Sequence, residues 1–139
     1  MLSLPLPVRV YLCLEPTDMR RSFDGLCRMV REFVGSDPLS GDLFVFRSKR
    51  GDRVKLLYWL GDGLAIWYRR LEEGTFVFPK LAESSGLSWS RAVGKQGLEI
   101  RGTDLAMLLD GVDLASVKRQ KRYHRPTAAT TAPAANDLP

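Results

Sequence analysis

Strand-length apolar segments separated by short polar turns dominate the middle of the chain. Residues 43–47, 53–60 and 64–71 are rich in valine, leucine and aromatic residues, and glycine-containing segments separate them. Apolar runs bounded by such turns predict antiparallel strands joined by hairpins. A fourth short strand is expected at 75–78, and it should end at Pro79 because proline cannot donate a hydrogen bond to the sheet.

The turn between the second and third of these strands sets a pairing register. Asp62-Gly63 is a two-residue turn signal, because glycine adopts positive φ angles without strain. A three-residue loop, which the sequence also allows, would shift the pairing by one residue. The two-residue turn predicts that Trp59 and Trp67 point to opposite faces, with Trp59 in the core and Trp67 free to contact a partner. The cross-strand pairs that it predicts are Trp59–Ile66, Tyr58–Trp67, Leu57–Tyr68 and Lys55–Arg70.

The N-terminal third predicts a strand followed by a long helix. Residues 8–14 alternate apolar and polar side chains, and Pro16 ends that pattern. Thr17 is a suitable helix N-cap, and Gly35 is a suitable residue to end the helix in the left-handed conformation. An amphipathic stripe with steps of three and four residues runs between them. It consists of Met19, Phe23, Leu26, Val30 and Phe33.

After the meander the pattern is weaker. Residues 81–96 predict no clear element, and residues 97–100 have the composition of a short strand. Thr103 or Asp104 would cap a short helix that ends at Gly111. The predicted fold class is therefore α+β, with an N-terminal strand and long amphipathic helix packed on an antiparallel β-meander, a small C-terminal helix and a disordered basic tail.

Charge divides the chain into a nearly neutral domain at 1–117 and a basic tail at 118–139. The net charge is +5, and five basic residues against Asp137 leave +4 in the tail. The domain carries 16 basic and 15 acidic residues, so the charge of the whole chain is not by itself a nucleic-acid signal. Hydrophobic residues make up 45% of the chain, which suffices for one core. The low apolar content of the tail predicts disorder.

The two cysteines, Cys13 and Cys27, do not have the spacing of a metal or redox motif. The sequence also lacks a secretory-signal pattern and an apolar stretch of membrane length. These features predict reduced thiols in a cytoplasmic protein that does not associate with a membrane.

The aspartates are the first candidates for catalysis, because a metal-dependent nuclease needs two or three carboxylates that converge on Mg²⁺. Local roles explain them better, since aspartate is favoured in helix first turns and in tight turns. His124 has no serine, cysteine or aspartate at a spacing typical of a triad. We therefore predict no catalytic residue, no metal and no cofactor. The aspartates concerned are Asp18, Asp24, Asp42, Asp52 and Asp62.

Basic and aromatic residues interleave on the predicted meander. Aromatic side chains on a sheet stack with bases, and cations neutralise phosphates. The alternative is that the aromatic residues belong to the core and the cations form a solvated rim. The tail is the stronger electrostatic signal, although such tails bind any polyanion. The candidate nucleic-acid or partner-binding residues are Lys49, Arg50, Arg53, Lys55, Trp67, Arg69, Arg70, Lys118, Arg119, Lys121 and Arg122.

Three segments carry a resemblance to a bacterial family. They are PTDMRRSFDGL, DPLSGDLFVFRSKRGDRVKLLYWLGDGLAIWYRRLEEGTFVFP and LAMLLDGVDL, in this order within residues 8–114. With them the chain resembles the small TnpB-type accessory protein, the second open reading frame, of insertion sequences of the IS66 type. The resemblance implies a role in DNA transposition beside a separate transposase. It carries over no catalytic residue, because the family has no established reaction of its own.

The sequence therefore predicts a non-enzymatic accessory protein that acts with the transposase of the same element and contacts DNA. A purely protein-binding module of the transposition complex is one alternative, and a metal-dependent nuclease subunit is another. Salt-dependent DNA binding separates the accessory protein from the protein-binding module. Convergence of the named aspartates in space would indicate the nuclease.

Overall fold

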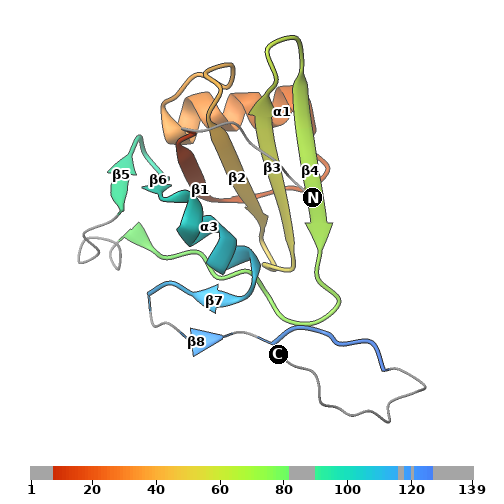
Figure 1. Ribbon diagram of the computed structural model, residues 1–139. Coiled ribbons are helices and arrows are strands. Elements are labelled where there is room, and N and C mark those ends of the chain that lie inside the picture. Colours follow the sequence, from red (N-terminus) through yellow and green to blue (C-terminus); the bar gives the residue numbers. More distant parts are fainter. Residues whose placement is uncertain (1–7, 82–89, 116–117, 120, 127–139) are drawn as a thin grey trace.

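The protein is built around a six-stranded mixed sheet with the strand order β4-β3-β2-β1-β6-β5 (Figure 1). The structure, a computed structural model, describes residues 8–81, 90–115, 118–119 and 121–126. The central neighbours β1 and β2 are parallel, and all the other neighbouring pairs of this sheet are antiparallel. The strands are β1 (Val10–Thr17), β2 (Leu43–Ser48), β3 (Arg53–Trp59), β4 (Leu64–Arg70), β5 (Arg91–Val93) and β6 (Gly97–Ile100), and a small second sheet pairs β7 (Val112–Asp113) with β8 (Lys118–Arg119).

Helices cover opposite faces of the large sheet. Successive side chains of a strand point to opposite sides, and apolar side chains on both faces of this sheet are buried. α1 (Phe23–Met29), continued by the π-helix η1 (Val30–Val34), lies on one face (Figure 1). α3 (Gly102–Leu109) and residues 71–78 lie on the other face. The core on the α1 side includes Tyr11, Cys13, Leu26, Phe44, Phe46 and Leu57. The core on the α3 side includes Val10, Leu12, Val45, Leu56, Phe76 and Leu108.

The α+β class is confirmed, but the predicted long helix is wrong because β1 continues into the expected helix start. Thr17 pairs with Ser48 of β2, so Thr17 is not an N-cap. Pro16 fits inside the strand because the pairing with β2 is irregular just before Thr17, where a missing N–H is tolerated. The helix begins after its N-cap residue Ser22, and only seven α-helical and five π-helical residues follow. Gly35 ends it with φ 69°, as predicted.

The β3–β4 hairpin turns one residue earlier than predicted. The Leu60 N–H donates to the Gly63 carbonyl oxygen at 2.9 Å, so Gly61 and Asp62 are the central residues of the turn. Gly61 has φ +97°, and glycine at the first central position is typical of a type II′ hairpin. The observed pairing differs by two residues from the register of the two-residue turn and by one residue from that of the three-residue loop, so both predicted registers are wrong. A shift of two residues leaves each side chain on the face that the two-residue turn predicted. The observed pairs include Trp59–Leu64, Leu57–Ile66, Leu56–Trp67 and Lys55–Tyr68.

Alanine at the two glycines of this hairpin should have different effects. A Cβ on Gly63 meets no atom within 4 Å, and its φ is not in the left-handed region. Gly63→Ala should therefore raise the free energy of unfolding by up to about 1 kcal/mol, because the unfolded chain loses freedom. Gly61→Ala should lower it by about 1–2 kcal/mol, because its φ is positive. Urea unfolding of both variants measures this, and a larger loss for Gly63→Ala would support the Asp62-Gly63 turn instead.

Residues 75–78 do not form the predicted fourth strand. They cross the α3 side of the sheet, where Phe76 and Phe78 are buried in the core. The Phe76 N–H donates to the Gly51 carbonyl oxygen at 2.7 Å, and the Arg47 Nη1 donates to the Phe76 carbonyl oxygen at 3.0 Å. A loop and a side chain thus satisfy this backbone in place of a neighbouring strand. An apolar run of four residues does not distinguish these two arrangements.

The C-terminal elements are closer to prediction. β6 occupies Gly97–Ile100, as expected. The N-cap of α3 is Arg101, and Asp104 accepts a hydrogen bond from the Arg101 N–H at 2.9 Å. The predicted caps, Thr103 and Asp104, therefore lie inside the first turn of the helix. Gly111 follows the helix with φ +98°.

Contacts with the core continue into the segment predicted to be a disordered tail. The Arg122 Nη1 donates to the Thr75 carbonyl oxygen at 3.1 Å. The Arg122 Cζ also lies 5.2 Å from the centroid of the Phe76 ring, in the geometry of a cation–π contact. The last thirteen residues of the predicted tail, 127–139, lie outside the described residues.

Both cysteines are free and buried. Burial raises the pKa of the Cys13 thiol to about 11, so this thiol is protonated at neutral pH. Cys13 therefore acts as a small apolar core residue. In the part of the chain that the structure describes, no helix combines the length and the apolar character needed to cross a membrane.

Candidate nucleic-acid interface

Ser48 fixes the backbone of the loop between β2 and β3 from within. Its Oγ accepts hydrogen bonds from the Gly51 N–H at 3.2 Å and from the Arg53 N–H at 3.1 Å. The same hydroxyl donates to the Asp52 Oδ1 at 3.3 Å. One buried serine at the end of β2 thus organises the whole loop, a use of serine that is common in turns.

The chain that follows β4 holds the same loop from outside. The Leu71 N–H donates to the Asp52 carbonyl oxygen at 2.7 Å, and the Phe76 N–H donates to the Gly51 carbonyl oxygen at the same distance. The loop is therefore restrained twice, by Ser48 from within and by the chain after β4 from outside. A loop that is ordered in advance loses little conformational entropy when it binds a ligand.

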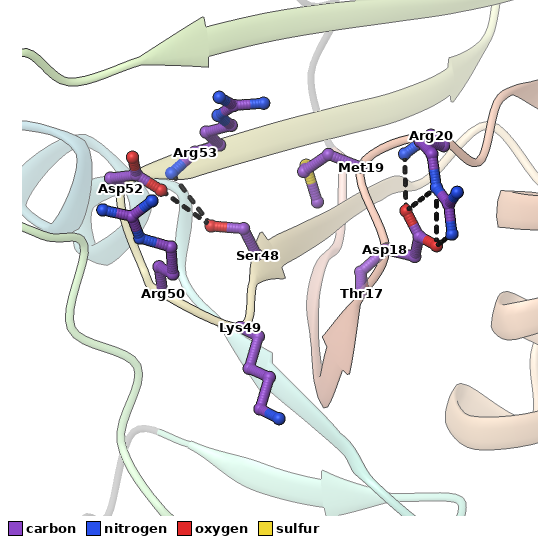
Figure 2. A pocket seen from close by; sticks show the side chains of 9 residues that line it. All are labelled: Thr17, Asp18, Met19, Arg20, Ser48, Lys49, Arg50, Asp52 and Arg53. Atoms are coloured by element: carbon purple, nitrogen blue, oxygen red, sulfur yellow. Dashed lines mark hydrogen bonds and ion pairs between the residues drawn. The ribbon is translucent and has the colours of Figure 1, made fainter.

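The loop and the segment after β1 line a pocket of about 400 Å³ at the carboxyl ends of the parallel strands β1 and β2 (Figure 2). Lys49 and Arg50 are exposed at the tip of the loop, and their side chains diverge in Figure 2. Four cations and two carboxylates line the pocket, which gives it a net charge of +2. The lining residues are Thr17, Asp18, Met19, Arg20, Ser48, Lys49, Arg50, Asp52 and Arg53.

An ion pair between Asp18 and Arg20 forms the other wall of the pocket. The Arg20 N–H and Nε donate to the Asp18 Oδ1 at 2.9 and 3.1 Å, and the Arg20 Nη2 lies 2.7 Å from Oδ2 (Figure 2). These hydrogen bonds lower the pKa of Asp18 to about 2, so its carboxylate is ionised at neutral pH. Because Asp18 neutralises Arg20, the excess positive charge of the pocket lies on the β2–β3 loop and on Arg53 at the start of β3.

Asp18, Asp42 and Asp52 make separate contacts. Asp42 accepts a hydrogen bond from the Ser40 hydroxyl at 3.1 Å, and Asp52 accepts one from the Ser48 hydroxyl. Within residues 8–81, 90–115, 118–119 and 121–126, no three His, Cys, Asp or Glu residues gather to hold a metal ion. The chemistry that the pocket itself offers is attraction of an anion.

Lys55, a predicted contact residue, lies inside the fold. Lys55 is only 8% exposed, and its Nζ donates to the carbonyl oxygens of Met19 and Arg21 at 2.8 Å each. The ammonium also lies 4.8 Å from the centroid of the Tyr68 ring. Lys55 therefore fixes the segment between β1 and α1, and its charge is directed to the backbone rather than outward.

Trp67 and Arg69 lie on the α3 side of the sheet. Trp67 packs against the core on that side, whereas Trp59 is half-buried on the α1 side and belongs to neither core cluster. Trp59 is therefore not the core residue that the sequence predicts, and Trp67, the predicted contact residue, is half-buried against the core. The Arg69 Nη1 donates to the Leu109 carbonyl oxygen at 3.1 Å, at the end of α3, where a cation is favourable.

Arg53 and Arg70 extend the basic surface toward the edge of the sheet. They are cross-strand partners, the Arg53 Nη1 donates to the Tyr68 hydroxyl at 3.3 Å, and Arg70 pairs with Glu72 at 3.1 Å. These four residues line a second hollow of about 320 Å³ that shares Arg53 with the first.

Four of the predicted contact residues lie in the predicted tail. Lys118 and Arg119 form β8, Lys121 is exposed, and Arg122 is packed on the core. Burial and the nearby Arg69 lower the pKa of Arg122. Of the predicted contact residues, the structure thus brings together Lys49, Arg50, Arg53 and Arg70.

Sequence reasoning missed two residues of this surface. Ser48 is only one polar residue in a predicted turn, and nothing in the pattern distinguishes it from Ser40. Arg20 lies within the range of the predicted long helix, and it is not among the predicted contact residues. The Asp18-Met19-Arg20 spacing is the available signal, because an aspartate that accepts the N–H two residues later closes a turn.

The fold and this site define a small α+β protein with a basic surface at one end of its sheet. The chain belongs to the IS66 Orf2-like family, because the model of the "IS66 Orf2 like protein" family matches residues 8–119. The resemblance seen in the sequence is thereby confirmed.

Two proteins of Sinorhizobium fredii (strain NBRC 101917 / NGR234) are similar to the chain. "Uncharacterized protein y4jC" is 34% identical over 120 residues, which are 86% of this chain and 92% of the relative. "Uncharacterized protein y4hO" is 36% identical over 106 residues, which are 76% of this chain and 82% of the relative. No solved structure matches the chain.

Proposed function

We propose that this protein is a non-enzymatic accessory factor in the transposition of an insertion sequence of the IS66 type, and that it contacts DNA directly. The observation that carries the proposal is the doubly restrained β2–β3 loop. Its exposed cations, Lys49 and Arg50, stand beside Arg53 and Arg70. When a protein binds DNA without sequence preference, contacts of lysine and arginine with phosphates supply most of the affinity.

The partner in this proposal is the transposase of the same element, which would supply the catalytic carboxylates. Family membership supports the association with an insertion sequence. The basic loop supports the contact with DNA. A factor of this kind would hold DNA near the transposase without changing a covalent bond.

A purely protein-binding role is the second candidate. The observation that favours it is the exposure of two large apolar side chains. Phe23 at the start of α1 is 43% exposed, and Leu60 in the β3–β4 hairpin is 62% exposed. In that case DNA would be held by the transposase alone.

A pull-down of the tagged full chain from cells that carry the complete element tests the proposal. Element DNA should be recovered with the wild type and lost with Lys49→Glu/Arg50→Glu. The matched control is Arg28→Glu/Arg31→Glu, which makes the same charge change on exposed positions of the helix. Recovery of the transposase without DNA, unchanged by nuclease treatment and by the loop variant, would contradict the proposal and favour the protein-binding role.

A further inference from the structure

The outer strand β4 presents a long open edge. The sheet ends in β4 on one side and in β5 on the other (Figure 1). β5 has three residues, whereas β4 has seven, with the sequence LAIWYRR. Native proteins usually shorten, bend or cover a long apolar edge, because its free backbone groups pair readily with another strand.

The hydrogen-bond pattern shows which groups of β4 face outward. Leu60 and Gly63 form a hydrogen-bonded pair at the hairpin, and such pairs alternate along an antiparallel ladder. Ala65, Trp67 and Arg69 therefore point their backbone groups toward β3. In the described part of the chain, no strand pairs with the outward backbone groups of Leu64, Ile66, Tyr68 and Arg70.

We propose that β4 pairs antiparallel with β4 of a second copy of this chain, centred on Trp67, and so joins two six-stranded sheets. The centre follows from the length of the strand, because this register gives all seven residues a partner. Ile66 then lies opposite Tyr68, and Leu64 opposite Arg70. The two Trp67 residues lie opposite each other.

The side chains of β4 are self-complementary in this register. Tyr68 is 47% exposed, and its ring would cover Ile66 of the second copy. Aromatic pairs and pairs of an aromatic with a β-branched residue are among the favourable cross-strand pairs. Trp67 would add an aromatic pair on the other face.

The charges at the two ends of β4 favour the antiparallel second copy over other occupants. Arg69 and Arg70 form its C-terminal end, and the exposed Asp62 precedes its N-terminal end. Antiparallel pairing places Arg70, which also pairs with Glu72 of its own chain, diagonally from Asp62 of the second copy, and it does so twice because of the two-fold symmetry. A parallel pair would instead align the arginines with each other, which is unfavourable.

The dimer would also separate the two basic loops. Each β2–β3 loop lies at the end of the sheet near Arg70, and an antiparallel pair puts these ends on opposite sides. The inference stands on the geometry of β4 and does not depend on DNA binding.

Sedimentation equilibrium of the full chain tests the interface through a charge swap. The wild type should dimerise, and Arg70→Glu or Asp62→Arg alone should raise the dissociation constant about tenfold, because two cross-strand contacts become repulsive. The double variant Asp62→Arg/Arg70→Glu should return the dissociation constant toward the wild-type value. Arg28→Glu makes the same charge change at an exposed position of α1. It is the matched control and should not change the dissociation constant.

Three results would overturn the inference. A monomeric wild type up to its solubility limit would mean that another segment of this chain or another protein's strand covers the edge. A dimer insensitive to both single variants would place the interface elsewhere. A double variant no tighter than the single variants would reject the register. Both substituted residues are exposed, and a surface ion pair contributes little to folding, so the variants should fold.

Discussion

Replacing Phe76 with alanine should lower the free energy of unfolding by about 3–5 kcal/mol. Phe76 is fully buried in the core on the α3 side of the sheet. Two guanidinium groups also lie over its ring, with the Cζ atoms of Arg69 and Arg122 at 5.7 and 5.2 Å from the centroid. Truncation would open a cavity and remove both cation–π contacts.

Urea unfolding of the full chain measures this loss. Small domains have a stability of about 5–15 kcal/mol, so the variant should be severely destabilised. Val77→Ala is the matched control, because Val77 is the half-buried neighbour in the same segment. The control should cost about 1 kcal/mol or less, since little volume is removed from the core. Equal losses for the two variants would show that residues 75–78 do not insert Phe76 into the core.

Reversing both charges at the tip of the β2–β3 loop should weaken the affinity for duplex DNA about 100-fold. Lys49 and Arg50 are exposed on a restrained backbone, so each is positioned to contact a phosphate. In Lys49→Glu/Arg50→Glu two favourable contacts would become two repulsions. Fluorescence anisotropy with labelled DNA measures the change at one fixed salt concentration.

The fold should be intact in this double variant. Neither loop cation forms an ion pair within the described residues, so thermal melts should match those of the wild type. If the folded variant binds DNA with the wild-type affinity, the DNA-binding surface lies elsewhere, for example on the predicted tail.

The meander was predictable because its strands obey local rules. Apolar runs and glycine-containing turns located β2, β3 and β4 to within a residue or so. The register was wrong because Gly61-Asp62 and Asp62-Gly63 are both plausible turns. The hydrogen bond between Leu60 and Gly63 and the positive φ of Gly61 separate them, and the sequence does not show which glycine adopts a positive φ.

The errors at Thr17 and Phe76 have a common cause in contacts between distant residues. Thr17 reads as a helix cap, but pairing with Ser48 keeps it in β1. Phe76 reads as a strand residue, but its N–H bonds to the Gly51 carbonyl oxygen in a loop. Each local preference was overridden by a partner at least 25 residues away along the chain, which periodicity does not reveal.

The candidate site shows the same division. Lys49 and Arg50, two of the predicted contact residues, are exposed because a polar glycine-containing turn exposes its tip. Lys55 looks equivalent in the sequence, yet its Nζ bonds to two carbonyl oxygens after β1. Whether a basic residue faces solvent or backbone depends on which segment packs across the strand.

The salt dependence of DNA binding tests the central claim most directly. The logarithm of the binding constant falls linearly with the logarithm of salt concentration, with a slope of about −0.9 per phosphate contact. Lys49→Ala/Arg50→Ala should therefore reduce the magnitude of the slope by about 1.8, while Arg28→Ala/Arg31→Ala should leave it unchanged. An identical slope for the wild type and the loop variant, or no DNA binding by the wild type at low salt, would contradict the account.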